Sequence, residues 1–166
     1  MPILFAIPFL GLLVILQSAV VNRMPLLHGT ADLLLLVIIA WALRPRVRTH
    51  WHWMVIGSLY ASLFTSLPIY VFPAGYLAAT ALAVALRRRV WKAPILAMFS
   101  VVFAITLGIH ILTVFILGLQ GTLLPIIEVL NQVTLPSLVL NLLLAVPIYA
   151  IIGDIADRFY PEELET

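Results

Sequence analysis

The sequence contains no cysteine and little charge. Without cysteine the chain can form no disulfide, and it offers no thiolate nucleophile or thiolate metal ligand. Only 10% of the 166 residues are charged, whereas soluble domains contain about 25% charged residues. Hydrophobic residues make up 64% of the chain, and the mean hydropathy is +1.18. A water-soluble fold cannot cover so much apolar surface, so the composition predicts a single membrane domain.

Sequence motifs of catalysis are also absent. The chain has no glycine-rich phosphate loop, no HExxH motif and no serine, histidine and acid combination placed for nucleophilic attack. It lacks the mid-membrane charges that ion-coupled transporters and pumps need. The net charge of +2 is too small an excess to indicate nucleic acid as a partner. We therefore expect neither an enzyme nor a protein that holds a metal or cofactor.

Apolar runs between charged residues and Pro or Gly breaks predict an all-α membrane protein. One domain at residues 1–152 contains six expected transmembrane helices, at 3–21, 31–43, 53–71, 74–86, 94–119 and 136–152. No Lys or Arg precedes Arg23, so the first run lacks the basic region of a signal peptide and is expected to be a retained helix. Residues 153–166 form an acidic tail.

Two segments between the spans need their own interpretation. Residues 53–86 carry no charge, and as one helix they would be about 51 Å long, so we expect the chain to fold back at Pro68, Pro73 and Gly75. Residues 122–135 place Glu128, Asn131 and Gln132 on one helical face. This pattern predicts an interfacial helix on the outer surface, and a loop packed on the bundle is the alternative.

The basic residues determine the expected orientation, because Lys and Arg near span ends stay in the cytoplasm. With six spans, eight of the nine basic residues lie on one side and only Arg23 lies on the other. Both termini are therefore expected in the cytoplasm. The eight residues are Arg44, Arg46, Arg48, Arg87, Arg88, Arg89, Lys92 and Arg158.

Small residues recur at helical spacing, as in helices that pack closely in lipid. This pattern predicts a tight bundle. The small residues are Gly57, Ala61 and Ser62 in the third span, Ala79 and Ala83 in the fourth, and Ala104 and Gly108 in the fifth.

Polar residues inside apolar spans are costly and need partners. Asp32 follows Thr30 at the start of the second span, where a carboxylate can accept from free backbone amides; a partner or ligand contact is the alternative. His110 has no acid or second histidine within a turn, which favours a hydrogen-bonded core histidine over a metal ligand or proton carrier. Asn141 precedes Pro147, and Gln17 lies near the outer end of the first span. Both are expected either to hold helices together or to dock a partner.

Three segments resemble the bacterial rod shape-determining protein MreD family: Leu16–Ser18, Ala31–Leu36 and Asn141–Tyr149. Their order, the chain length and the terminal position of the last motif also agree, and the resemblance covers residues 3–152. The chain departs from the family pattern at Ala31, where many members have proline, and at Thr65 or Ser66, where many have an acidic residue.

The resemblance implies a non-enzymatic component of the cell-elongation machinery in the bacterial cytoplasmic membrane. Its implied partner is the bitopic protein MreC, and its implied role is to couple the MreB cytoskeleton to peptidoglycan synthesis by RodA and its penicillin-binding transpeptidase, which maintains rod shape. A homodimer stays open as a further association. By family match, the residues expected to dock a partner or stabilise the bundle are Gln17, Asp32, Asn141, Pro147 and Tyr149.

The alternative function also comes from the resemblance, because the family fold is similar to that of the substrate-binding subunits of energy-coupling-factor vitamin transporters. A ligand pocket needs several convergent polar groups, and the outer loops offer few: Arg23, His28, Glu128, Asn131 and Gln132. For the cytoplasmic basic residues, we expect solvated loop charge that sets topology. Contact with anionic lipid, at about 1 kcal/mol for each residue, is the alternative for Arg87, Arg88 and Arg89.

Overall fold

The structure, a computed structural model, describes residues 2–19, 29–88, 93–122 and 124–161. These ranges are helical, with short connections and no strand. The three segments at 126–159 follow one another without a break, so the described residues form six continuous helices. The elements are α1 (Pro2–Ala19), α2 (Leu33–Leu43), α3 (His50–Leu63), α4 (Val71–Arg87), α5 (Pro94–Leu119), α6 (Ile126–Val129), the π-helical turn η2 (Leu130–Thr134) and α7 (Leu135–Phe159).

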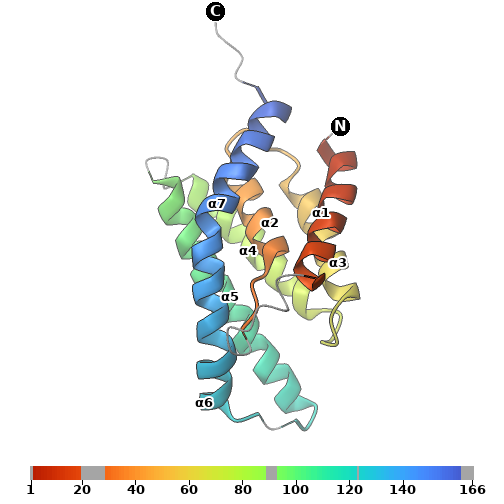
Figure 1. Cartoon of the computed structure of the whole chain (residues 1–166), viewed down its shortest axis with the longest axis vertical. Coiled ribbons are helices and arrows are strands. Elements are labelled where there is room, and N and C mark those ends of the chain that lie inside the picture. The colour runs from red at the N-terminus through yellow and green to blue at the C-terminus, as the bar shows by residue number, and fades with distance from the viewer. Residues whose placement is uncertain (1, 20–28, 89–92, 123, 162–166) are drawn as a thin grey trace, which may run out of the picture.

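The shortest of the six helices, α2, forms the centre of the bundle (Figure 1). All 11 of its residues are buried, and it contacts α1, α3, α4, α5 and α7. Its sequence, LLLLVIIAWAL, is apolar on every face, which is typical of a helix enclosed by others. At 1.5 Å per residue α2 is only about 16 Å long, so both of its ends lie among the surrounding helices. The free backbone N–H and C=O groups at these ends therefore need polar partners from those helices.

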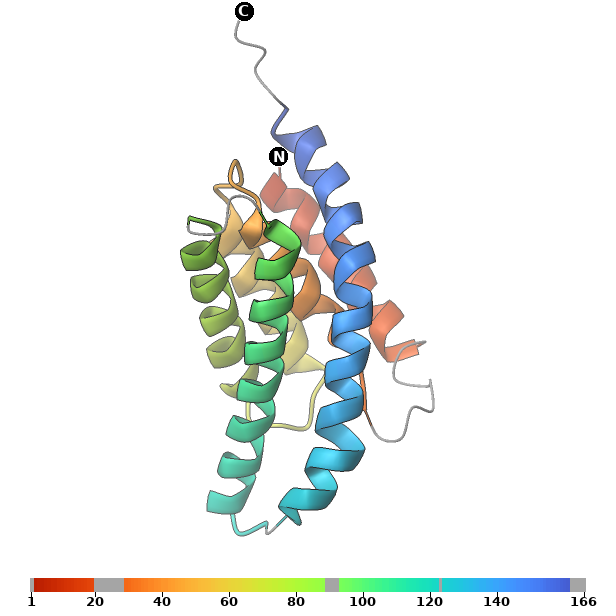
Figure 2. The ribbon, with the colours of Figure 1, turned by 90° about the vertical axis from the view of Figure 1, so that its left-hand side faces the viewer.

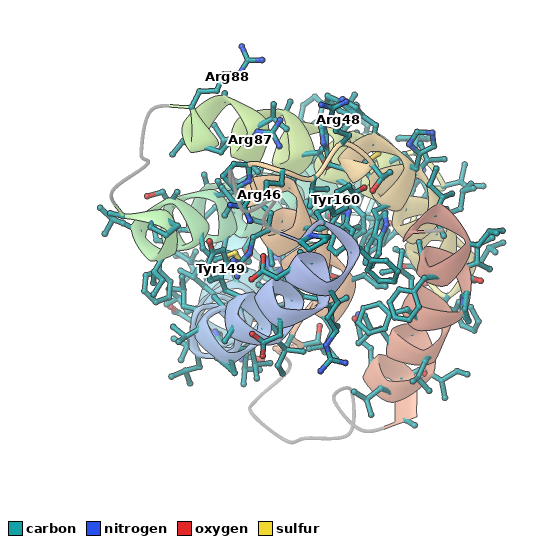
Figure 3. All side chains as sticks on the ribbon, turned by 90° about the horizontal axis from the view of Figure 1, so that it is seen from above. Arg46, Arg48, Arg87, Arg88, Tyr149 and Tyr160 are labelled. Carbon is teal, nitrogen blue, oxygen red and sulfur yellow. The ribbon has the colours of Figure 1, made fainter. Side chains whose placement is uncertain are left out.

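One end of the bundle collects both described chain ends and the basic connections. The N-terminus of α1 and the C-terminus of α7 lie at the same end (Figure 1). The α2–α3 connection, the end of α4 and the start of α5 also lie there, and Figure 3 shows Arg46, Arg48, Arg87 and Arg88 from that side. The predicted basic residues Arg89 and Lys92 lie outside the described residues.

Among the described residues, two helices are long and apolar enough to cross a membrane: Pro94–Leu119 and Ile126–Phe159. Figure 2 shows that both continue beyond the rest of the bundle, at the end opposite the chain termini. The helix at 94–119 has the limits expected from sequence. Other apolar helices are shorter.

The fold-back between α3 and α4 differs from the expected one. We expected a span over 53–71, but α3 begins at His50 and ends at Leu63. The Ser62 hydroxyl donates to the carbonyl of Ile69 at 3.0 Å, and this bond holds the turn. Pro73 is the third residue of α4, where a missing backbone N–H costs little. The expectation that Pro73 and Gly75 form the turn is therefore wrong, and Pro68 alone of the three lies in it.

The last helix also differs from prediction. We expected a span over 136–152 and a separate interfacial helix over 122–135. Instead residues 126–159 form one helix, and no separate interfacial helix is present in the described part of this segment. The predicted span begins at Pro136 because proline breaks an apolar run. The wider π-helical turn at Leu130–Thr134 precedes this proline and carries the helix into α7.

Candidate functional site

The N-terminus of α2 lies inside the bundle, where its first backbone N–H groups need acceptors. Asp32 is the N-cap residue, as expected from sequence, and its Oδ1 atom accepts from the Leu35 N–H at 2.9 Å. A carboxylate at this position also interacts favourably with the positive end of the helix dipole. Asp32 therefore satisfies one of the free donors of α2 itself.

Side chains from two other helices satisfy three more backbone donors at this point. Gln17 on α1 accepts from the Leu33 N–H through Oε1 at 2.9 Å. Asn141 on α7 accepts from the Asp32 N–H through Oδ1 at 2.8 Å. Ser137, one turn earlier on α7, accepts from the Thr30 N–H at 3.0 Å. We call this set of capping contacts the α2 network.

Two further helices join the α2 network through side-chain pairs. Tyr76 on α4 is fully buried, and its hydroxyl lies 2.7 Å from Oδ1 and 2.9 Å from Oδ2 of Asp32. The amide group of Asn141 donates to the Thr106 hydroxyl on α5 at 3.1 Å. Helices α1, α4, α5 and α7 are thus each connected by hydrogen bonds to the start of α2. Buried polar groups need such partners, because an unmade bond there costs about 1–3 kcal/mol.

A cavity of about 450 Å³ adjoins the α2 network. It lies between α5, the helix formed by α6, η2 and α7, and the α3–α4 turn. Its wall is mostly apolar. The polar lining residues include Gln17, Thr30, Asp32, Thr106, His110, Thr113 and Asn141, and the apolar ones include Leu35, Leu67, Phe72, Ile109, Val114 and Val129.

His110 on α5 forms a hydrogen bond between its Nδ1 atom and the Thr134 hydroxyl at 3.0 Å. Thr134 is buried and belongs to η2, the π-helical turn that precedes α7. This is the hydrogen-bonded core histidine that the sequence favoured. The contact joins α5 to the last helix below the α2 network.

The C-terminal end of α2 is capped by arginine. Arg87 on α4 donates through Nη1 to the carbonyls of Ala42 and Arg44, each at 3.2 Å, and lies 3.4 Å from that of Val47. Ala42 belongs to the last turn of α2, whose carbonyls lack their usual donors within the helix, and the Arg44 carbonyl also accepts from the Val47 N–H at 3.3 Å. The expectation that Arg87 is only a solvated topology charge is therefore wrong. Its neighbour Arg88 is exposed, as expected.

Arg44, the C-cap residue of α2, reaches α7 at Tyr149. Its Nη2 atom donates to the Tyr149 carbonyl at 3.0 Å, and its guanidinium carbon lies 4.4 Å from the centre of the Tyr149 ring. A Cβ atom at Gly153 would overlap the Arg44 guanidinium, so α7 approaches Arg44 closely there. Pro147, between Asn141 and Tyr149, lies on the exposed side of α7.

The small residues predicted to mediate helix packing divide into two groups. Gly57, Ala79 and Ala83 are buried, Ser62 holds the α3–α4 turn and Ala61 is half-buried. A Cβ at Gly57 would lie 2.5 Å from the Ile38 side chain, so α3 needs glycine to approach α2. Ala104 and Gly108 instead lie on the exposed face of α5. No atom lies within 4 Å of a Cβ built at Gly108, so the expected packing within the bundle is not met there.

Sequence reasoning identified Gln17, Asp32 and Asn141 but missed the residues that complete their hydrogen bonds. Tyr76, Thr106 and Ser137 are buried polar residues in apolar helices. That property alone is a signal, because a polar side chain in such a helix needs a partner. Which partner it takes depends on contacts between residues as far as 109 positions apart.

The described residues contain no group of three His, Asp or Glu side chains placed to hold a metal ion. No protein-family model, curated protein or solved structure matches the chain. The α2 network and the cavity beside it are therefore characterised by their own geometry: a central helix whose two ends are held by polar side chains of its neighbours.

Proposed function

We propose that the chain is a multi-pass protein of the bacterial cytoplasmic membrane and a non-enzymatic scaffold of the cell-elongation machinery. In this proposal it has six transmembrane helices with both termini in the cytoplasm. It binds MreC and helps to couple the MreB cytoskeleton to peptidoglycan synthesis by RodA and its transpeptidase. The function is that of the MreD family, which the sequence resembles.

Membrane insertion is supported by the side chains that cover the bundle. Large apolar residues are exposed on the helices, and Leu63 and Leu119 are 72% and 73% exposed. Soluble monomers rarely expose contiguous apolar surface of this kind. The basic residues of two hairpin ends lie together at the end that carries both termini, and the positive-inside rule assigns such an end to the cytoplasm.

One observation carries the scaffold proposal. The three segments that resemble the MreD family meet on α2: Gln17 and Asn141 cap its N-terminus beside Asp32, and Tyr149 receives Arg44 from its C-terminus. Four of the five residues that the family match singled out thus contact the ends of the central helix, and the fifth, Pro147, lies on the exposed side of α7. This arrangement suits a rigid bundle that presents fixed outer faces to other membrane helices.

The topology can be tested with single cysteines, since the chain has none of its own. Arg46→Cys and Arg88→Cys replace exposed residues of the two basic connections, and Glu128→Cys replaces an exposed residue at the opposite end. In intact cells, a membrane-impermeant maleimide is expected to label only the Glu128→Cys variant. Labelling of Arg46→Cys or Arg88→Cys would contradict the proposed orientation.

The scaffold function can be tested by co-expression with the MreC protein of the same genome. A photo-crosslinking residue is placed at one exposed position on each of four helices: Leu12, Leu59, Phe103 and Leu143. We expect MreC to be captured from one face only and to co-purify with the unmodified chain. Absence of MreC from every crosslink and from the purified protein would contradict the proposal.

The second candidate function is ligand binding, as in a substrate-binding subunit of an energy-coupling-factor-like transporter, and the cavity favours it. Its volume of about 450 Å³ falls within the range of about 300–1,000 Å³ that is typical of small-molecule sites. Its polar groups come mainly from α1, α5, α7 and the start of α2, and Glu128, Asn131 and Gln132 are not among them. Mass spectrometry of protein purified in detergent distinguishes the two functions, because a transporter subunit would retain a small molecule in stoichiometric amount.

A further inference from the structure

The cavity beside the α2 network adjoins backbone N–H groups that already have acceptors. The backbone N–H groups of Thr30, Asp32, Leu33 and Leu35 each already donate to a side-chain oxygen. A buried helix N-terminus usually attracts anions through such donors. Here the protein's own side chains use them, so this end of α2 has lost the means to bind an anionic ligand.

Asp32 contributes a carboxylate that has no cationic partner among the described residues. Its Oδ1 atom accepts from the Leu35 N–H and lies 2.7 Å from the Tyr76 hydroxyl, which lies 2.9 Å from Oδ2. The backbone N–H of Leu34 also interacts with this carboxylate. No basic side chain among the described residues interacts electrostatically with it. The helix dipole offsets about half a unit charge. A buried carboxylate is costly in its charged form unless it is paired or hydrogen-bonded, and Asp32 lines the cavity, where a bound cation would add such a pair.

The rest of the cavity suits the apolar body of a small ligand. Leu35, Phe72, Ile109 and Val114 line it, drawn from α2, α4 and α5. Thr106 and Thr113 on α5 add hydroxyl groups to the lining. Shape and charge together describe one occupant: a small organic cation with an apolar body.

We propose that this cavity is a binding site for a small amphiphilic organic cation, whose ammonium group pairs with the Asp32 carboxylate and whose apolar part lies against Phe72, Ile109 and Val114. The inference deepens the second candidate function and rests on it, and it is independent of the scaffold function. The ammonium group would donate to the Asp32 carboxylate, beside the Tyr76 hydroxyl.

The test uses three probes of one shape and different charge: 4-phenylbutylammonium, 4-phenylbutan-1-ol and 4-phenylbutyrate. Binding to the full chain in lipid nanodiscs is measured by isothermal titration calorimetry. We expect the cation to bind with one-to-one stoichiometry and an affinity at least about tenfold higher than that of the alcohol, since a buried charge pair is lost without the ammonium group. The carboxylate probe is expected not to bind.

Two variants locate the site. Asp32→Asn keeps an N-cap side chain and should remove the preference for the cation over the alcohol. Val114→Phe fills the cavity without changing the α2 network and should abolish binding of all probes. Ile111→Phe, on the exposed side of the same helix, is the matched control and should bind as the unmodified chain does.

The outcomes distinguish two questions: whether the cavity binds a ligand, and whether it recognises the positive charge of that ligand. Equal binding of cation and alcohol, blocked by Val114→Phe, would overturn the cation inference while supporting a ligand-binding cavity. No saturable binding of any probe would overturn the inference outright. Cation binding that survives Asp32→Asn unchanged would overturn it as well, because the carboxylate would then have no part in recognition.

Discussion

The side-chain oxygen of Asn141 accepts a hydrogen bond from the backbone N–H of Asp32 at 2.8 Å, so the last helix caps the central one. Asn141 also donates to Thr106 on α5 at 3.1 Å and is 2% exposed. One amide group therefore joins three helices in the interior of the bundle.

Replacement of Asn141 by leucine tests this junction. Leucine has a similar volume but cannot accept from Asp32 or donate to Thr106, so buried groups lose their partners. We expect the free energy of unfolding in mixed detergent micelles to fall by about 1–3 kcal/mol. Leu143→Ala, on the exposed face of the same helix, should have a smaller effect. Equal losses would contradict a capping role for Asn141.

Arg87 and Arg88 provide a test in which both variants change the charge equally. Arg87 donates to carbonyls at the end of α2, whereas Arg88 is exposed. Arg87→Met should lower the free energy of unfolding by about 1–3 kcal/mol, because buried acceptors lose their donor. Arg88→Met should change it little. If the two variants have the same stability, then Arg87 serves topology alone.

Glycine replacements should have opposite effects at two positions. A Cβ at Gly153 would overlap the Arg44 guanidinium, so this group would have to move and lose its hydrogen bond to the Tyr149 carbonyl. Loss of a hydrogen bond to a charged group costs about 1.5–3 kcal/mol. Gly153→Ala is therefore expected to lower the thermal unfolding midpoint. Gly108→Ala meets no atom within 4 Å and should raise the midpoint, since alanine favours a helix by about 1 kcal/mol over glycine. A higher midpoint for Gly153→Ala would contradict the close approach of Arg44.

His50 should make stability depend on pH. It is buried at the start of α3, and this burial lowers the pKa of its imidazole below the ordinary value of 6.5. The hydrogen bond to the Val47 carbonyl opposes this effect, and the positive charges of Arg87 and His52 lower the pKa further. The unfolded chain thus binds a proton more readily than the folded chain. The stability contributed by neutral His50 is present above pH 6.5 and is lost as the pH falls below it.

Thermal unfolding between pH 7.5 and pH 5 measures this dependence. His50→Gln should reduce the loss of stability at low pH, because it removes the buried titrating group. His52→Gln, which replaces an exposed histidine, is expected to retain most of the dependence. Identical pH profiles for the two variants would show that another group is responsible.

Several features of the fold were accessible from sequence because they depend on local patterns. The limits of α5 follow from an uninterrupted apolar run that begins at Pro94. Asp32 was expected at a helix start because a carboxylate there satisfies its own backbone. The break between α3 and α4 was expected from length alone, but its place was not, because the hydrogen bond from Ser62 to Ile69 ends α3 earlier than Pro68 indicates.

The sequence by itself determined that the chain is helical and apolar throughout, with basic residues confined to a few connections. Tertiary structure alone decided that α2 is the enclosed helix, that residues 126–159 run on as one helix, and that Arg87 is a cap. The physical reason is that helix formation depends on neighbouring residues in the chain. The free N–H and C=O groups at the ends of a buried helix, in contrast, take partners from whichever helices pack beside them.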